Sequence, residues 1–423
     1  MKTLSFVFLF VGSAAALPAA EVGPSGVALE PLVAEIVAQH PERAFYAAEI
    51  EAAKAGRNAA GSRPDPELAF EVGRKRVRDA GGALRGEGAA WSVSLRQTFD
   101  WPGRLALRKA IANRQIEFAE LGLARFERAL AARARTLAYG LYAGHARALA
   151  VREVADRFAT LKATFLAREP AGITPLLETR VIEAGELVLQ RRAVAAELAL
   201  QAALIELNLL RGAAAAAPLR IAAATLRFQD APPVAELLVA ALEQNFDFKM
   251  KRVELEQHGA EVRLAQHERR PAISVGPYLA QERAGDRETT VGLGLSVPLP
   301  VGGRTRGAIE GAEARRRQAE AALEAARREL EREVVTAAQA FATRVGETRR
   351  WSADTADKFR EAAALADRHY RLGAVPIATY VELQYSYLDA VEALLDTQRE
   401  ALEAGLRLQL LAGVDFNAVQ VVP

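Results

Sequence analysis

Hydrophobic and polar residues alternate in two neighbouring stretches near the start of the chain. Residues 67–73, ELAFEVG, and residues 91–99, WSVSLRQTF, carry mostly large apolar side chains at every second position and mostly small or polar ones between them. A period of two residues is typical of a β-strand with one apolar and one polar face. The polar, glycine-rich residues 74–88 predict a loop between them, so we expect a β-hairpin over residues 66–99.

A long helical pattern follows this hairpin. Residues 105–169 contain no proline, which at 1.5 Å per residue predicts a rod of roughly 95–100 Å. Its leucines recur at spacings of seven, seven and four residues, the narrow apolar seam of a coiled coil. Residues 176–211 predict a further helix that ends before Gly212, and residues 29–60 predict a helix ahead of the hairpin, interrupted at Pro41.

The second half of the chain repeats this order of elements. It predicts a helix over residues 234–270, a hairpin over 271–299 with a polar loop at 281–288, a long helix over 305–372 and a helix over 377–411. Residues of the two halves match at offsets of 205, 200 and 201: Pro66 with Pro271, Gly103 with Gly303, and Gly212 with Gly413. Matches in phase over this length indicate an internal duplication of a helix, hairpin, long helix and helix.

The duplication and the N-terminus divide the chain. A lysine, an apolar core and small residues are typical of a secretory signal, so we expect residues 1–20 to be a signal peptide. Residues 21–212 form the first repeat, 213–233 a linker, 234–413 the second repeat and 414–423 a tail. No later stretch reaches about 18 consecutive apolar residues, so we expect no further membrane-spanning helix.

The four predicted strands have apolar faces that water would expose, and an open sheet leaves two unpaired edges that a bilayer does not tolerate. Both problems disappear when three chains pool their strands into one closed barrel of twelve. We therefore predict a mainly α fold with a small β part, in which a trimeric membrane barrel continues into a long helical tunnel. The predicted lipid-facing residues are Leu68, Phe70, Val72, Trp91, Val93, Leu95, Ile273, Val275, Val291, Leu293, Leu295 and Val297. The predicted lumen-facing residues are Ser92, Ser94, Arg96, Ser274, Gly276, Gly292, Gly294 and Ser296.

The composition mainly excludes other classes of function. The net charge is +2, and arginine alternates with glutamate, which favours solvated helix faces and argues against a nucleic-acid partner. There is no cysteine, hence no disulfide, thiol chemistry or cysteine-ligated metal. The five histidines form no HExxH motif, and residues 301–307, VGGRTRG, lack the phosphate-loop pattern. We predict no catalytic, cofactor or metal site, and no enzyme.

Three segments carry a resemblance to a known family. These are the strand, PGR turn and helix start at residues 91–108, their copy LSVPLPVGGRTRGAI at 295–309, and YRLGAVPIATYVELQYSYLDA at 370–390. They resemble the outer membrane efflux protein family, the TolC-like outer membrane factors. PDPELAFEVG and LRQTFDWPGRLALR are most similar to its CzcC-type heavy-metal branch.

The resemblance implies a homotrimer in the outer membrane of a Gram-negative bacterium, with its tunnel in the periplasm. It implies a passive exit duct for metal ions or small molecules. The implied partners are a periplasmic adaptor, an inner-membrane transporter, most often of the RND type, and outer membrane lipid.

The resemblance also implies a gate at the periplasmic tip, where the long helices end. Tyr370 and Gly373 match the family's tyrosine and glycine there, Glu382 falls at a constricting acidic position, and Glu178 falls where the acidic partner of the tyrosine sits. Tyr380 is a further candidate gate residue. The candidate adaptor-docking residues are Gly172, Pro175, Gly373 and Pro376.

Two residues depart from the family pattern at this gate. Thr379 stands where an acidic residue is frequent, and Val375 stands at an arginine position. The gate could therefore close through apolar and tyrosine contacts, including Tyr385, more than through charge. For Glu178 and Glu382 the alternative is that they are ordinary solvated carboxylates.

Other functions remain open at this point. A periplasmic coiled-coil scaffold or adaptor would use the same helices, a type I secretion channel would use the same barrel, and an exported enzyme would need a catalytic constellation. The sequence does not identify the transported substrate, the pump or the signal cleavage position.

Overall fold

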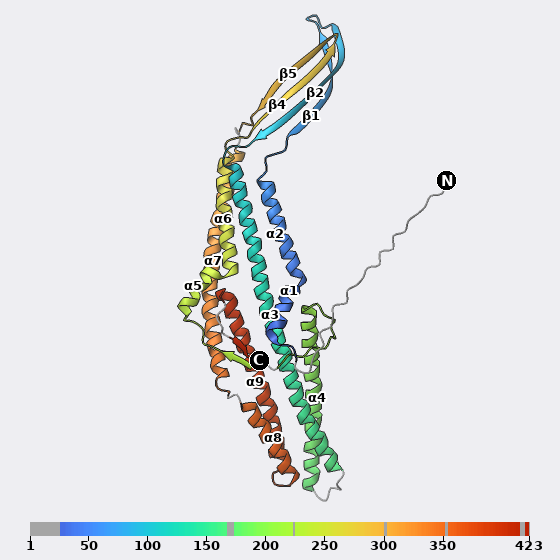
Figure 1. Cartoon of the computed structure of the whole chain (residues 1–423), viewed down its shortest axis with the longest axis vertical. Coiled ribbons are helices and arrows are strands. Elements are labelled where there is room, and N and C mark those ends of the chain that lie inside the picture. Colours follow the sequence, from blue (N-terminus) through green and yellow to red (C-terminus); the bar gives the residue numbers. More distant parts are fainter. Residues whose placement is uncertain are drawn as a thin grey trace, which may run out of the picture.

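The protein is a long column with a β-sheet at one end and helices along the rest (Figure 1). The structure, a computed structural model, describes residues 26–166, 173–222, 225–299, 303–351, 354–414 and 419–422. The predicted signal peptide, residues 1–20, lies outside the described residues.

Two β-hairpins from the two halves of the chain form one antiparallel sheet at the upper end of Figure 1. The strand order is β1-β2-β4-β5, so the hairpins lie side by side with β2 against β4. The strands are β1 Glu67–Arg78, β2 Leu84–Phe99, β4 Ile273–Ala284 and β5 Asp286–Ser296.

The strands are longer than the apolar pattern predicts. Residues 74–88 and 281–288, predicted as loops, are mostly strand, and the turns are limited to residues 79–83 and to Gly285, at φ +98°. The loop predictions were wrong because ladder hydrogen bonds join main-chain groups, so pairing continues where the side chains on both faces become polar.

The helices run from the sheet to the opposite end of the column. The longest, α3, has 63 residues, about 95 Å at the helical rise. In the first half the helices are α1 Leu29–Gln39, α2 Pro41–Ala60, α3 Arg104–Leu166 and α4 Ile173–Leu210. In the second half they are α5 Val234–Gln244, α6 Phe246–His267, α7 Arg304–Thr348, α8 Thr355–Arg371 and α9 Ile377–Ala412.

The helix predicted from residue 234 is broken at Asn245. The residue at the matching position of the first half is His40, 205 residues earlier, where α1 gives way to α2. The His40 ring accepts a hydrogen bond from the Glu42 amide at 3.3 Å, and the Asn245 side chain accepts one from the Phe248 amide at 2.9 Å. Both residues therefore cap the helix that follows, and the break recurs although the proline of the first half does not.

The second long rod is also shorter than predicted. The sequence predicts one helix over residues 305–372, whereas α7 ends at Thr348 and α8 begins at Thr355. The intervening sequence, RRWSAD, contains serine and aspartate, which favour helix starts over helix interiors. Its counterpart in α3 at an offset of 200, LAVREV at residues 149–154, contains no serine or aspartate and continues as helix.

The predicted linker and tail carry additional structure. β3 Thr225–Phe228 pairs with β6 Val419–Val422 in a two-stranded sheet, and Val27 forms a bridge with Ile221. The described residues thus hold six strands, not four. The prediction failed because alanines and prolines mask the apolar residues of the linker, and Leu219, Ile221 and Leu226 are buried.

The interior consists of three separate apolar clusters along the column rather than one core. The middle cluster joins α1, α3, α4, α9 and the linker, the second lies among α3, α4, α8 and α9 at the far end, and the third joins α5, α7 and α9. This layout keeps a narrow column of helices together over its whole length.

Candidate functional site

The sheet has one apolar face and one polar face, as the alternation predicts. Cross-strand pairs Leu68–Leu95, Phe70–Val93 and Val275–Leu295 join apolar residues, whereas Ser274–Ser296 and Gly276–Gly294 join small or polar ones. Apolar side chains on this face are widely exposed in the single chain: Val291 by 76%, Leu293 by 77% and Leu68 by 73%. An exposed apolar face of this extent fits a lipid environment better than water.

The two outer strands of this sheet have no partner on their outer edges. β1 pairs only with β2 and β5 only with β4 among the described residues. Unpaired strand edges cannot stand in a bilayer, because their amide and carbonyl groups find no hydrogen bonds there. The sheet is therefore incomplete in one chain.

At the opposite end of the column the chain turns back twice, between α3 and α4 and between α8 and α9 (Figure 1). Gly373 takes φ +74°, and Pro376 caps the start of α9. Of the other docking candidates, Pro175 lies in the first turn of α4 and Gly172 lies outside the described residues.

An aromatic cluster fills the interior just inside these turns. The rings of Tyr370 and Tyr380 stack with centroids 5.2 Å apart, and the ring of Phe158 lies 5.3 Å from that of Tyr380 and 6.4 Å from that of Tyr385. Phe158 and Tyr380 have no exposed surface. These contacts fasten α3 to α8 and α9.

The structure brings three of the four candidate gate residues together. Tyr370 and Tyr380 stack, and the carboxylate of Glu178 on α4 acts on the hydroxyl of Tyr370. Burial, together with this carboxylate, raises the pKa of Tyr370 to about 12. Glu382 lies apart, exposed on α9 and without an ion pair among the described residues.

Tyr380 carries a buried polar group. Its hydroxyl has no hydrogen-bond partner among the described residues, and burial raises its pKa. An unsatisfied buried hydroxyl costs stability. The stacking of the Tyr370 and Tyr380 rings therefore has to offset this loss of stability.

A polar network beside the cluster was not predicted from the sequence. The buried amide of Gln384 donates to the carbonyl of Ala363 at 2.7 Å and accepts from Arg157 at 3.0 Å. Arg157 also binds Glu153 at 2.6 Å, and Glu153 binds Arg360 of α8. Phe158 was not predicted from the sequence either. The signal that could have identified it as buried is its helical spacing from Val151, Val154 and Leu161.

Alkaline pH tests the Tyr370 contact. An unfolded tyrosine loses its proton near pH 10, but folded Tyr370 keeps it to about pH 12. Between these values the folded state binds the additional proton, so stability falls as pH rises from 10 to 12. We expect a falling thermal midpoint over this interval and a smaller fall in Tyr370→Phe. An equal fall in the variant would contradict the assignment.

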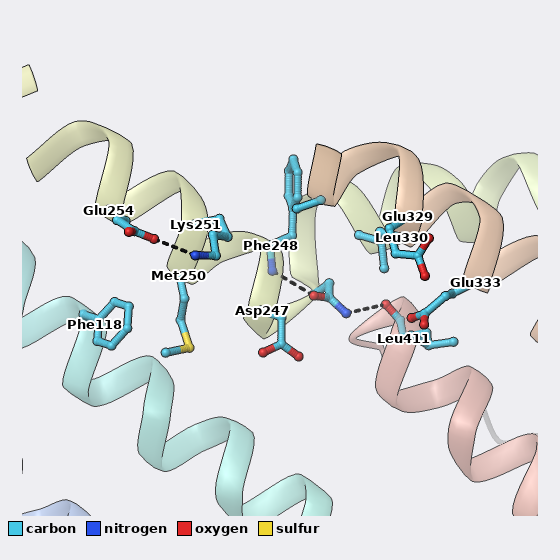
Figure 2. Close-up of a pocket in the computed structure, with 12 residues that line it drawn as sticks. Phe118, Asp247, Phe248, Met250, Lys251, Glu254, Glu329, Leu330, Glu333 and Leu411 are labelled. Carbon is cyan, nitrogen blue, oxygen red and sulfur yellow. Dashed lines mark hydrogen bonds and ion pairs between the residues drawn. The ribbon is translucent and has the colours of Figure 1, made fainter. Parts of the chain in front are cut away.

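A groove of about 310 Å³ lies among α3, α6, α7 and the end of α9 (Figure 2). Four of its charged lining residues belong to ion pairs of the helices: Asp247 with Arg125, Lys251 with Glu254, and Glu329 with Arg332. Asn245 ties the break after α5 to the end of α9 by donating to the carbonyl of Leu411 at 3.0 Å. The groove is best described as a junction between helices. Among the described residues, no group of three or more histidines and carboxylates is placed to hold a metal ion.

One helix has the length and composition of a membrane span, contrary to the expectation that none would. It comprises Leu176–Leu210 of α4, and only 22% of its most apolar 18-residue segment is buried. The exposed apolar residues of α4 are Leu176, Leu177, Val181, Leu187, Val188, Val194, Leu198, Ile205 and Leu209. Since the buried residues of α4 pack in both the middle and far-end clusters, this helix belongs to the column and presents an apolar stripe on its outer side.

Comparison with known proteins finds similar sequences and folds. The sequence model described as outer membrane efflux protein matches residues 237–414. A membrane protein from Pseudomonas aeruginosa superimposes with a TM-score of 0.74 at 22% identity, covering 92% of this chain and 91% of that one. No curated sequence gives a significant match.

Two further solved structures extend the comparison. The CmeC outer membrane channel of Campylobacter jejuni has a TM-score of 0.70 at 13% identity, covering 97% of this chain and 94% of that one. The MtrE outer membrane channel of Neisseria gonorrhoeae, in its open state, has a TM-score of 0.70 at 15% identity, covering 91% and 88%. These likenesses confirm the predicted fold class.

Proposed function

We propose that this chain, whose residues 237–414 make it a member of the outer membrane efflux protein family, is the outer membrane exit duct of a tripartite efflux system. The observation that carries the proposal is the sheet. Its apolar face is exposed, its edges are unpaired, and it leads directly into helices of about 95 Å. A barrel that continues into a helical tube is a conduit.

The duct is a homotrimer. Three copies of the four-stranded sheet make twelve strands, and the outer edge of β5 in one copy can pair with β1 of the next. The apolar stripe on α4 gives each copy a second surface for a neighbour to cover. The column then spans the periplasm, with the barrel in the outer membrane.

The far helix ends meet the other components of the pump. The turns at residues 372–376 and between α3 and α4 are the surfaces for a periplasmic adaptor, which links the duct to an inner-membrane transporter of the RND type. The cargo is a metal ion or a small molecule. The residues that most resemble the CzcC-type branch favour metal ions.

The same end of the column is the gate. Tyr370 and Tyr380 stack inside it, the carboxylate of Glu178 acts on the Tyr370 hydroxyl, and Glu382 is exposed on α9. Closure rests mainly on aromatic contacts, with the carboxylates in support.

The gate residues make a graded prediction. Tyr370→Phe removes the hydroxyl on which the Glu178 carboxylate acts. At about 0.5–1.5 kcal/mol for one polar contact, the closed state becomes about two- to tenfold less favoured. Glu382→Ala removes one exposed charge and has a smaller effect. Both should raise single-channel conductance and antibiotic uptake. Unchanged conductance in both variants would remove these residues from the gate.

The function itself is tested by fractionation followed by conductance measurement. We expect a heat-modifiable trimer that needs detergent for extraction and conducts ions in planar bilayers. A soluble monomer without conductance would favour the periplasmic scaffold or adaptor instead. Loss of a secreted protein from the medium, rather than drug or metal sensitivity, in a deletion strain would favour a type I secretion channel. The family is one of efflux proteins, and we propose no catalytic activity for this chain.

A further inference from the structure

We propose that the outer end of the barrel binds the phosphate groups of anionic lipid through a row of outward-facing arginines. The inference rests on the proposed function, because it takes the apolar face of the sheet as the lipid-facing one. It concerns a part of the strands that the sequence predicts as loop.

The strand register shows where the row of arginines lies on the sheet. Val72 pairs with Trp91, Trp91 with Gln281, and Gln281 with Thr289, so these four residues form one rung on the lipid-facing side. Trp91 stands where the apolar band ends toward the hairpin turns. An aromatic residue at such a position is typical of the membrane interface.

Three arginines lie one step beyond this rung on the same face. Two residues further toward the turns, β1 carries Arg74, β4 carries Arg283 and β5 carries Arg287. Two residues span about 7 Å along a strand, so the guanidinium groups follow directly on the apolar band. All three side chains are exposed, and Arg76 continues the row on β1.

Their charge is poorly neutralised within the chain. Arg74 and Arg76 share one carboxylate, that of Glu87, at 3.4 and 3.2 Å. Arg283 and Arg287 face each other as a direct cross-strand pair and make no ion pair with described residues. Like charges directly opposite each other destabilise a sheet, so this pair calls for an anion from outside.

The lumen-facing side of the same strands is different. Lys75 lies on that face, and its ammonium group binds Glu282 at 2.5 Å and Glu288 at 2.7 Å. Lys75 on the inside therefore binds two carboxylates, whereas on the outside Arg74 and Arg76 share one carboxylate and Arg283 and Arg287 pair with none of the described residues. A general excess of basic residues at the strand ends would not separate the two faces in this way.

The chemistry of the row selects phosphate on a lipid. Guanidinium groups bind phosphate oxygens through paired N–H donors and are more weakly hydrated than lysine. Because these arginines adjoin the apolar band, their ligand has to stand at headgroup depth, where a free anion is not held. The phosphorylated glycolipid of the outer leaflet has this chemistry.

The test uses the purified full-length trimer in detergent, with binding of lipid A counted by native mass spectrometry. At about 1 kcal/mol per arginine, the variant Arg74→Gln/Arg283→Gln/Arg287→Gln should bind on the order of a hundredfold more weakly. The control Arg306→Gln/Arg316→Gln/Arg328→Gln removes the same charge from exposed positions of α7 and should bind as the wild type. Dephosphorylated lipid A should bind weakly to all forms.

If the glutamine variant fails to insert into the membrane, the corresponding lysine variant still tests the proposal. Arg→Lys at the three positions keeps the charge and loses the paired donors, so we expect several-fold weaker binding. Equal binding by wild type and variants overturns the proposal, as does an equal loss in the α7 control. Full competition by inorganic phosphate would also overturn it, since the site would then be one for a free anion. If the duct assignment is at fault instead, the wild type itself lacks the trimer and the conductance.

Discussion

Leu293→Arg should reduce the heat-modifiable trimer in the outer membrane fraction at least tenfold. Leu293 lies within the apolar run of β5 and is 77% exposed in the single chain, so the substitution disturbs no packing in the isolated sheet. An arginine on the lipid face of a barrel destabilises it by about 2–4 kcal/mol near the middle of the bilayer, and in a trimer this destabilisation occurs three times. The measurement is immunodetection of the folded trimer in separated membranes.

Thr290→Arg is the matched control. Thr290 lies on the same strand, is also exposed, and belongs to the opposite face, where it pairs with Ala280. There the arginine enters a wet lumen, so trimer yield should stay near that of the wild type. If both variants assembled equally well, the assignment of the apolar face to lipid would be wrong.

Phe158→Ala should open the far end of the column. The Phe158 ring is fully buried and contacts Tyr380 and Tyr385, so its removal leaves a cavity between α3 and α9. Phenylalanine-to-alanine changes in a core cost about 3–5 kcal/mol. The loss falls on the contacts that we propose to keep the gate closed, and single-channel recordings should show a conductance several-fold above that of the wild type.

Phe341→Ala separates this effect from a general loss of stability. Phe341 is 1% exposed in the cluster of α5, α7 and α9, away from the far end. Its removal should lower the thermal midpoint by a similar amount and leave conductance unchanged. A rise in conductance in both variants would mean that loosened packing anywhere opens the channel.

The sequence predicted the column and the faces of the sheet because both depend on local period. Alternation at residues 91–99 assigns each side chain to a face without knowledge of its neighbours, and the register bears this out. The strand ends were missed for the same reason. Around Arg74 and Arg283 both faces are polar, so the period of two residues gives no contrast although the ladder continues.

Contacts between distant segments were less accessible to sequence reasoning. Tyr370 and Tyr380 were candidates through resemblance, but their neighbour Phe158 is more than 200 residues away and looks like any other seam residue of a long helix. The pairing of β3 with β6 joins residues that lie almost 200 positions apart, and four-residue strands give almost no periodic signal. The break at Asn245 was within reach, since the offset of 205 from His40 marks it.

The apolar stripe of α4 has a consequence for biogenesis. Before it meets its neighbours in the proposed trimer, each copy has this stripe and one side of its sheet uncovered, and both are surfaces that promote aggregation. Overproduction, which leaves many copies without partners, should therefore yield inclusion bodies rather than surplus single subunits.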